Sequence, residues 1–352
     1  MVTLADRTIA RRLLIVGGRG GTNIGDSMER AAGRLGIATT VADANLAMKG
    51  PALLRKCRWR LCGRKPLRLE QFSDTIVRLC EEYRPDLLLV IGITPPEHRC
   101  LQAAGKLGII RAAFLTDDPW SPYRRAPWFL KALSEYDFVF SPREANLADL
   151  RGITGATIKY LQFGYDPDLF FPVSRSADFA ADVMFAGGAD ADRVPYIGAL
   201  VKSGLKVDLY GSYWERYPET RHLTRGQADV AVLREAVANA RVSLCLVRRA
   251  NRDGHSMRTF EVPAMRGCAI MEDTAEHVSI FGEDGRSVLY FRTIDEMRRR
   301  VAWLLEHPEE RERLADEGHR LVTGGANTYQ DRLASILRTV GKAELIGTAS
   351  AC

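Results

Sequence analysis

The sequence predicts an α/β fold made of two halves, each built around a mostly parallel sheet. Short apolar runs alternate with helical patterns, and this alternation is typical of right-handed βαβ units. The alternation restarts after a polar and aromatic segment over 162–172, QFGYDPDLFFP. The length of 352 residues suits two domains of ordinary size. We therefore expect two Rossmann-like domains linked near residue 170.

The first half opens with an apolar run that ends in glycines, as a buried strand entering a turn does. A helix should follow, because Met28, Ala31, Ala32 and Leu35 share one face at helical spacing. A later amphipathic helix should end before Pro85. The strands expected here are Arg11–Gly17, Ala38–Ala42, Asp86–Ile91, Ile110–Leu115 and Phe138–Phe140, and the helices are Gly25–Leu35 and Glu70–Tyr83.

The second half repeats this organisation and then becomes helical. Helices should fill most of 294–340, with a break at Pro308, because proline cannot continue a helix interior. The expected strands are Asp182–Ala186, Lys206–Tyr210, Val242–Val247, Cys268–Met271 and Val288–Phe291, and the earlier helices are Val194–Ser203, Gln227–Asn239 and Phe260–Arg266. Ligands of open α/β sheets bind beyond the carboxyl ends of the strands, so the loops after these strands are the place to seek a site.

Composition excludes several classes of protein. With 46% hydrophobic and 27% charged residues, the chain resembles folded proteins rather than disordered ones. No apolar run approaches the roughly 20 residues of a membrane span. Seven scattered cysteines without redox or zinc spacing favour a reduced, cytoplasmic compartment. The sequence also has no nucleophile elbow, H-E-x-x-H or Cys/His metal spacing, so we expect no metal ligands and no redox cofactor.

Positive charge is concentrated in one window, residues 49–68. The eight basic residues there are Lys49, Arg55, Lys56, Arg58, Arg60, Arg64, Lys65 and Arg68, with no acid between Asp43 and Glu70. Leu53, Leu54, Trp59 and Leu61 supply apolar side chains among them. One interpretation is a solvated, mobile loop. The other is a segment that docks an anionic or lipid-linked acceptor, or a membrane surface. Nucleic acid is not an expected partner, because the remaining surface is not strongly basic.

Two polar motifs follow strands of the first half. Gly18, Gly20 and Gly21 precede a helix and could present backbone amides to a phosphate, although the spacing is neither a dinucleotide nor a P-loop fingerprint. The alternative is a flexible turn. Asp117 and Asp118 follow a strand and are placed to act as a general base or to hold hydroxyls, with helix capping as the alternative. At another strand end, His98 is a weaker catalytic candidate, and a structural role is the alternative.

In the second half, Asp253 and Glu261 lie eight residues apart across the start of a helix. The backbone amides of a helix start are unpaired, so they can bind a phosphate. Carboxylates beside them can accept hydrogen bonds from sugar hydroxyls. The alternative is that the acids only cap the helix and favour its dipole.

The run HSMRTFEVPAMRGCAIMED at 255–273 resembles the C-terminal domain of glycosyltransferases of the CgeB type, named after a spore maturation protein. LTDDPW at 115–120, the segment LQFGYDPDLFFP and the run DVMFAGG resemble further motifs of that family. The resemblance implies the GT-B fold of two Rossmann-like domains facing across a cleft, with C-terminal helices packing back toward the N-domain. It also implies a C-terminal domain like that of glycosyltransferase family 1.

On this resemblance, residues 1–165 form the acceptor-side domain, 166–325 the nucleotide-sugar domain and 326–352 a C-terminal helix and tail. The expected activity is a metal-independent, hexosyltransferase-like glycosyl transfer. The donor, a substrate rather than a cofactor, would be a UDP-, GDP- or dTDP-linked sugar. The acceptor and the choice between retention and inversion stay open. The alternative is a binding or assembly protein that keeps the fold without catalysis.

The resemblance also assigns roles to individual residues. Glu261 matches the glutamate that holds the nucleotide ribose, and Asp253 falls where related retaining enzymes carry a glutamate near the donor sugar. An aspartate there is one methylene shorter. The other expected donor-site residues are Gly187, Gly188, Arg193, His255, Ser256, Arg258 and Thr259. Arg193 and Arg258 would stabilise the leaving diphosphate. If the reaction inverts, Asp117 or Asp118 would act as the base.

Overall fold

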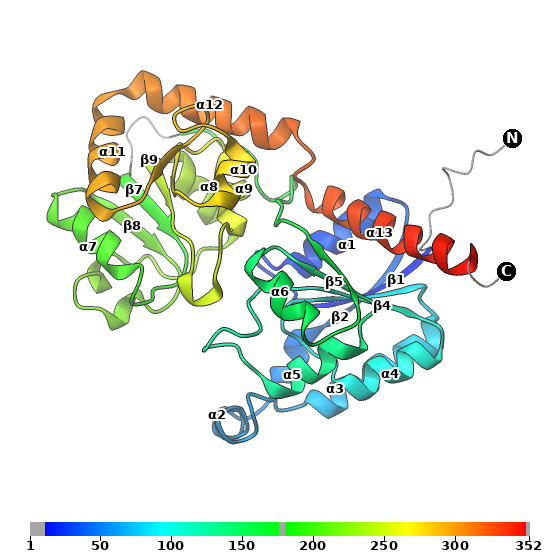
Figure 1. The fold of residues 1–352 in the computed structure, drawn as a ribbon. Helices are drawn as coiled ribbons and strands as arrows, with labels where there is room; N and C mark the ends of the chain where they lie inside the picture. Colours follow the sequence, from blue (N-terminus) through cyan, green and yellow to red (C-terminus); the bar gives the residue numbers. More distant parts are fainter. Residues whose placement is uncertain (1–10, 176–179, 350–352) are drawn as a thin grey trace, which may run out of the picture. The chain divides into compact units, whose positions relative to one another are not determined.

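The computed structural model describes residues 11–175 and 180–349, and the chain divides into two compact units. Unit 1 contains the chain up to Gln162, the short segment Ala250–Arg252 and the chain from Tyr329 onward. Unit 2 contains Phe163–Arg249 and Asp253–Thr328. Each unit has its own sheet, its own helices and its own apolar core (Figure 1). Two parallel-sheet α/β domains are therefore confirmed.

Unit 1 is built on a six-stranded sheet in which neighbouring strands all pair in parallel. The order is β2-β1-β3-β4-β5-β6, so the sheet reverses its direction of growth between β1 and β3. The bounds are β1 Arg12–Gly17, β2 Ala38–Asp43, β3 Leu87–Ile91, β4 Ile110–Phe114, β5 Phe138–Ser141 and β6 Thr157–Tyr160. Sequence analysis missed β6, because its alternate residues are exposed at the sheet edge and its apolar signal is weak.

Helices cover both faces of this sheet. In Figure 1, α3, α4 and α5 lie below the sheet and α1 and α13 above it. The helices of the unit are α1 Ile24–Arg34, α2 Ala52–Leu61, α3 Leu69–Tyr83, α4 His98–Lys106, α5 Pro127–Ala132, α6 Ala145–Arg151 and α13 Tyr329–Ala349. The C-terminal helix α13 packs against α1, which confirms the expected return of the chain's end to the N-terminal domain.

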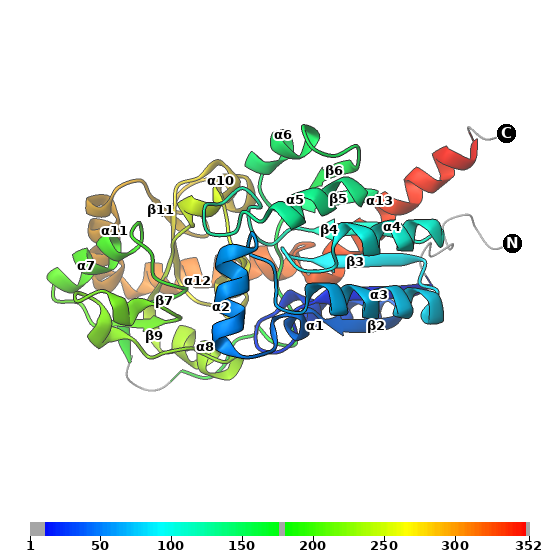
Figure 2. The same ribbon diagram turned by 90° about the horizontal axis from the view of Figure 1, so that it is seen from below.

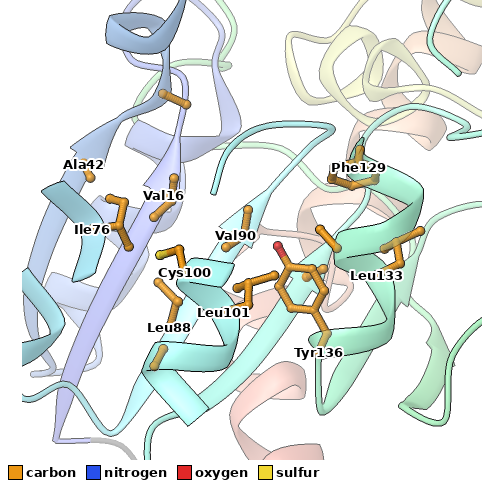
Figure 3. Packing of buried hydrophobic residues seen from close by; sticks show 14 of the residues in the cluster. Val16, Ala42, Ile76, Leu88, Val90, Cys100, Leu101, Phe129, Leu133 and Tyr136 are labelled. Carbon is orange, nitrogen blue, oxygen red and sulfur yellow. The ribbon is translucent and has the colours of Figure 1, made fainter. Parts of the chain in front are cut away.

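The core of unit 1 follows from the alternation of side chains along its strands. Val16, Leu88 and Val90 point from β1 and β3 toward the apolar faces of α3 and α4, where Ile76 and Leu101 meet them (Figure 3). The neighbouring strand residues point to the opposite face of the sheet. Strands buried on both faces read as continuous apolar runs, which is why they were visible in the sequence.

Unit 2 repeats the plan with a five-stranded parallel sheet in the order β11-β10-β9-β7-β8. Its strands are β7 Ala181–Ala186, β8 Val207–Tyr210, β9 Ala240–Cys245, β10 Ala269–Glu272 and β11 Leu289–Phe291. Its helices are α7 Val194–Lys202, α8 Val230–Ala238, α9 Met257–Ala264, α10 Ala275–Phe281, α11 Ile294–Glu306 and α12 Pro308–Gly324. The expected break at Pro308 is present, because this proline opens α12. Strand order reverses at β7 and β9, which makes the loops after these strands the topological switch point.

The basic window also contains a regular element. Residues 52–61 form helix α2, which Figure 2 shows as a separate helix outside the layers that cover the sheet. The solvated-loop interpretation of this stretch is therefore wrong. Across 11–175 and 180–349, no helix is both long enough and apolar enough to cross a membrane.

Candidate functional site

The strongest candidate site lies in unit 2 at the switch point of its sheet, where one arginine joins the two loops. Arg193 is the N-cap residue of α7 and is buried. Its Nη1 donates to the carbonyl oxygen of Gly188 at 3.1 Å, in the loop after β7. Its Nη2 donates to the carbonyl oxygen of Leu246 at 3.0 Å, in the loop after β9. Arg193 therefore fixes the two loops at which ligands of such sheets bind.

Burial, together with the neighbouring charge of Arg248, lowers the pKa of Arg193 to about 10. The side chain still carries its proton at neutral pH. Asp190 balances part of the charge, because its Oδ2 lies 3.8 Å from Nη1 of Arg193. The positive charge of Arg193 is therefore buried under the glycine loop and is not exposed to solvent.

The glycine loop approaches Arg248 closely. A Cβ atom at Gly188 would lie 3.3 Å from Nη2 of Arg248, a tight contact that glycine avoids. The amide groups of Gly187 and Ala189 donate to the carbonyl oxygens of Tyr210 and Ser212. Within the described ranges, the Gly188 amide makes no such bond. This places one backbone donor beside one guanidinium group, an arrangement suited to a phosphate oxygen.

Arg248 is a candidate site residue that sequence analysis missed. Its side chain is 30% exposed, against 8% for Arg193, and its Nε lies 3.5 Å from Oδ2 of Asp190. The residues on both sides of Arg248 are bound to Glu272. Its carboxylate accepts from the amide of Val247 at 2.7 Å and from Nη2 of Arg249 at 2.8 Å. Because Arg248 directly follows the apolar run 242–247, the rule that ligands bind beyond the carboxyl ends of strands could have found it.

The start of α9 is supported by a chain of buried hydrogen bonds. The Ser256 amide donates to Thr259 Oγ1 at 3.0 Å, and Thr259 Oγ1 lies 3.0 Å from His277 Nε2. Nδ1 of His277 faces the carbonyl oxygen of Glu272 at 2.7 Å, so this nitrogen carries the proton and Nε2 accepts from Thr259. Burial lowers the pKa of His277 to about 4, so the ring is neutral. Ser256 and Thr259 therefore shape the helix start.

Glu261 lies one turn into α9 and is buried. Arg258, which is partly exposed on the preceding turn, forms an ion pair with its Oε2. The pair places a carboxylate and a guanidinium together at the N-terminal end of α9. A ribose hydroxyl could donate to this carboxylate beside Arg258.

Asp253 and His255 flank Gly254 in the loop before α9. The Asp253 amide donates to the carbonyl oxygen of Arg248 at 3.2 Å, and the Asp253 carboxylate is among the charges that raise the pKa of Arg193. His255 is buried with Nδ1 2.5 Å from Oε2 of Glu276, and its Nε2 accepts from the Phe163 amide at 3.1 Å. Because both ring nitrogens are engaged within unit 2, His255 anchors the loop.

The glycine loop of unit 1 is occupied by its own side chains. The Gly20 amide donates to Asp26 Oδ2 at 2.6 Å, and the Gly20 carbonyl oxygen accepts from Asn23 Nδ2 at 2.6 Å. Gly20 and Gly21 have the positive φ values of 84° and 59° that favour glycine. A carboxylate already stands where an incoming phosphate would bind, so Gly187 and Gly188 form the better phosphate loop.

The paired aspartates of unit 1 have different surroundings. Asp118 is buried and receives Arg252, with Nε at 2.6 Å from Oδ2 and Nη2 at 3.1 Å from Oδ1. Its Oδ1 also accepts from the Trp120 amide. Asp117 is less buried, accepting from Asn251 Nδ2 at 2.9 Å with Arg124 Nε at 3.5 Å. Asp117 is therefore the better placed of the two to accept a proton.

His98 stands apart from this pair. It is half-buried at the first position of α4, after the loop that follows β3. None of the hydrogen bonds or ion pairs found in the described residues joins it to Asp117 or Asp118. The structure therefore gives His98 no partner of the kind that a catalytic histidine uses to fix its ring.

Comparisons with known proteins agree with the fold. A family model described as glycosyl transferase-like matches residues 194–338. Sucrose-phosphate synthase from Thermosynechococcus elongatus is 13% identical with a TM-score of 0.64, covering 95% of this chain and 100% of its own. A glycosyltransferase from Rickettsia africae is 11% identical with a TM-score of 0.61, covering 93% and 97%.

HepE from Anabaena, whose structure was determined with UDP and glucose, is 12% identical with a TM-score of 0.60, covering 94% of this chain and 100% of its own. None of the curated proteins compared with the chain matches it. Likeness over nearly the whole of these chains shows that this protein has the GT-B fold of glycosyltransferases.

Proposed function

We propose that the protein is a glycosyltransferase that takes a sugar from a nucleotide-sugar donor bound by unit 2. The observation that carries the proposal is the loop pair at the switch point, where Arg193 joins Gly188 to Leu246 and Arg248 lies beside the Gly188 amide. A nucleoside diphosphate needs positive charge and backbone donors at this place in a Rossmann-like sheet. The glycosyl transferase-like match over 194–338 supports the same assignment.

Each part of the donor has a candidate partner. Arg248 and the Gly188 amide would hold the diphosphate, and Arg193 would add its charge from below. The carboxylate of Glu261 would accept from the ribose hydroxyls beside Arg258. Asp253, in the loop between Arg248 and the start of α9, would face the sugar. Because HepE was studied with UDP and with UDP-glucose, a UDP-linked hexose is the donor we propose first.

The chemistry expected of these residues is stabilisation of the leaving group. As the glycosidic bond to the diphosphate breaks, negative charge grows on the phosphate oxygens. Preorganised donors aimed at that charge lower the barrier without having to rearrange. We propose that the arginines and backbone amides do this without a metal ion. If the reaction inverts the anomeric centre, Asp117 would take the proton of the acceptor hydroxyl.

A donor panel tests the proposal. UDP-, GDP- and dTDP-sugars are added to the purified protein, thermal stabilisation is recorded, and release of the nucleoside diphosphate is assayed with and without candidate acceptors. The proposal predicts that one nucleotide class stabilises the fold and that the diphosphate is released. Stabilisation without release under any condition would instead point to a binding protein.

A further inference from the structure

The leucines of α2 form an exposed apolar stripe. Leu53, Cys57 and Leu61 are spaced four residues apart, so they share one helical face, and Leu54 borders it. Leu53 is 72% exposed, Leu54 55% and Leu61 82%. None of the ten residues of α2 is buried. An amphipathic helix of a globular domain normally turns its leucines to the core, whereas α2 leaves its three leucines exposed and has only Arg58 and Trp59 partly covered.

The orientation of α2 is held by its surroundings. Arg58, one turn after Leu54 and only partly exposed, donates from Nε to the carbonyl oxygen of Pro66 at 3.1 Å and forms an ion pair with Glu70. Just past the helix, Arg64 donates to the carbonyl oxygens of Pro122 and Arg125 at 2.6 and 2.9 Å. These contacts hold α2 and the turn after it against the rest of unit 1, while Leu53, Leu54 and Leu61 stay exposed.

Positive charge borders the stripe. Lys56 and Arg60 fall one step around the helix from Leu53, and both are exposed. In the part of the chain that the structure describes, neither side chain forms an ion pair. The nearest acids in sequence are Asp43 and Glu70, so no carboxylate within the window offsets these cations. Exposed leucines beside unpaired cations are typical of a helix that lies in a membrane interface.

We propose that α2 is the membrane-binding element of this protein and that it docks on an anionic bilayer surface. The leucines would enter the boundary between head groups and acyl chains. Lys56 and Arg60 would extend their stems along the apolar surface and place their charges at lipid phosphates. The helix would lie flat on the bilayer without spanning it. This inference does not depend on the proposed chemistry of unit 2.

Vesicle flotation with the full chain tests the proposal. The vesicles are phosphatidylcholine alone, or phosphatidylcholine mixed with phosphatidylglycerol. We expect the protein to float only with the anionic vesicles, and to bind less as salt increases, since exposed charges are screened over about 10 Å at 0.1 M. The double variant Leu53→Ser/Leu61→Ser should lose flotation. Lys56→Gln/Arg60→Gln should weaken it about 25-fold, at about fivefold for each cation near an anionic surface.

Matched variants elsewhere control for general changes in surface polarity. Val232→Ser/Val278→Ser removes comparably placed apolar side chains of unit 2, which are 41% and 42% exposed. Lys106→Gln/Arg320→Gln removes two exposed cations outside the window. Both control variants should float as the unmodified protein does. Because α2 has no buried residue, its variants should keep the circular dichroism spectrum and UDP affinity of the unmodified protein.

The proposal is overturned if the unmodified protein does not float with anionic vesicles, or if the two α2 variants float as well as the controls. Light scattering tests the alternative that the stripe binds a second copy of the chain. If the protein forms a dimer that Leu53→Ser/Leu61→Ser dissociates, and does not float, then the stripe binds a second copy instead of lipid.

Discussion

Arg193 donates a hydrogen bond to the carbonyl oxygen of Gly188 at 3.1 Å and thereby holds the glycine loop from below. Its other terminal nitrogen reaches the loop after β9 at Leu246. The resemblance found in the sequence assigned Arg193 directly to the diphosphate. The structure instead gives its guanidinium two backbone partners and leaves Arg248 as the more exposed cation. We infer that Arg193 positions the loops while Arg248 meets the ligand.

Replacing Arg193 should therefore affect stability as well as binding. Arg193→Ala removes the donors of the buried Leu246 carbonyl oxygen and the partly buried Gly188 carbonyl oxygen, and we expect the free energy of unfolding to fall by about 3 kcal/mol. Arg248→Ala removes an ion pair that is partly exposed, so its loss should be no more than about 1 kcal/mol. Urea denaturation of the two variants measures the difference. Equal losses would show that Arg193 does not support the loops.

The carboxylate of Glu261 should matter for the nucleoside. Glu261→Ala should weaken nucleotide binding by about 1–3 kcal/mol, the scale of a hydrogen bond to a charged group. It also leaves Arg258 without its partner, so Arg258→Ala/Glu261→Ala is the matched control. Calorimetric titration with UDP gives both affinities. Unchanged affinity in both variants would mean that the ribose lies elsewhere.

Of the paired aspartates, Asp118 should matter for stability and Asp117 for the rate of the reaction. Asp118→Asn weakens the pair between the buried Asp118 and the partly exposed Arg252, and should destabilise unit 1 by about 1–3 kcal/mol. Asp117→Asn should leave stability nearly unchanged and, in an inverting enzyme, lower kcat by at least 100-fold. Thermal unfolding and steady-state rates distinguish the two. Normal turnover by Asp117→Asn would remove Asp117 from the reaction.

Acid should destabilise unit 2 through His277. Burial lowers its folded-state pKa to about 4, below the ordinary value of 6.5. Between pH 6.5 and about 4, the unfolded chain therefore binds a proton at His277 that the folded chain does not bind. Stability that is present above pH 6.5 is lost as the pH falls toward 4. The slope from this group is at most about 1.4 kcal/mol per pH unit.

His277→Gln, which keeps a side chain able to face Thr259, should reduce that slope between pH 6.5 and 4. The free energy of unfolding, measured by urea titration at several pH values, checks the prediction. A variant with the same slope as the unmodified protein would show that other groups cause the acid sensitivity.

Turnover should not require a divalent ion, because Arg248, Arg193 and the Gly188 amide supply positive charge and hydrogen bonds to the diphosphate. Adding excess EDTA should then leave the rate of donor consumption unchanged. A rate that falls in EDTA and recovers with magnesium or manganese would refute this prediction.

Much of the fold could be predicted because parallel strands buried on both faces leave continuous apolar runs, such as the one at Leu87–Ile91. The break at Pro308 was visible for an equally local reason. Helix α2 was not predicted, because its apolar stripe faces away from the core and its many cations resemble a solvated segment. Local patterns report which residues are apolar, but not which direction they face.

The residues of the candidate site were likewise predicted only in part. Gly187 and Gly188 were assigned through the family resemblance, and the structure places them at the switch point of the sheet. Arg248 was missed, although it follows the apolar run 242–247, because lone arginines are common on surfaces. That Gly20 donates to Asp26, and that Asp118 holds Arg252, depends on contacts that sequence spacing does not reveal.

Calorimetric titration of UDP into the unmodified protein, Arg248→Gln and the distant control Arg320→Gln tests the central claim most directly, since the claim is that unit 2 binds a nucleoside diphosphate at Arg248 and Gly188. We predict measurable UDP binding that weakens at least tenfold in Arg248→Gln, about 1.4 kcal/mol, and stays unchanged in Arg320→Gln. Equal UDP affinity in all three proteins, or no binding of UDP, GDP or dTDP by the unmodified chain, would contradict the account.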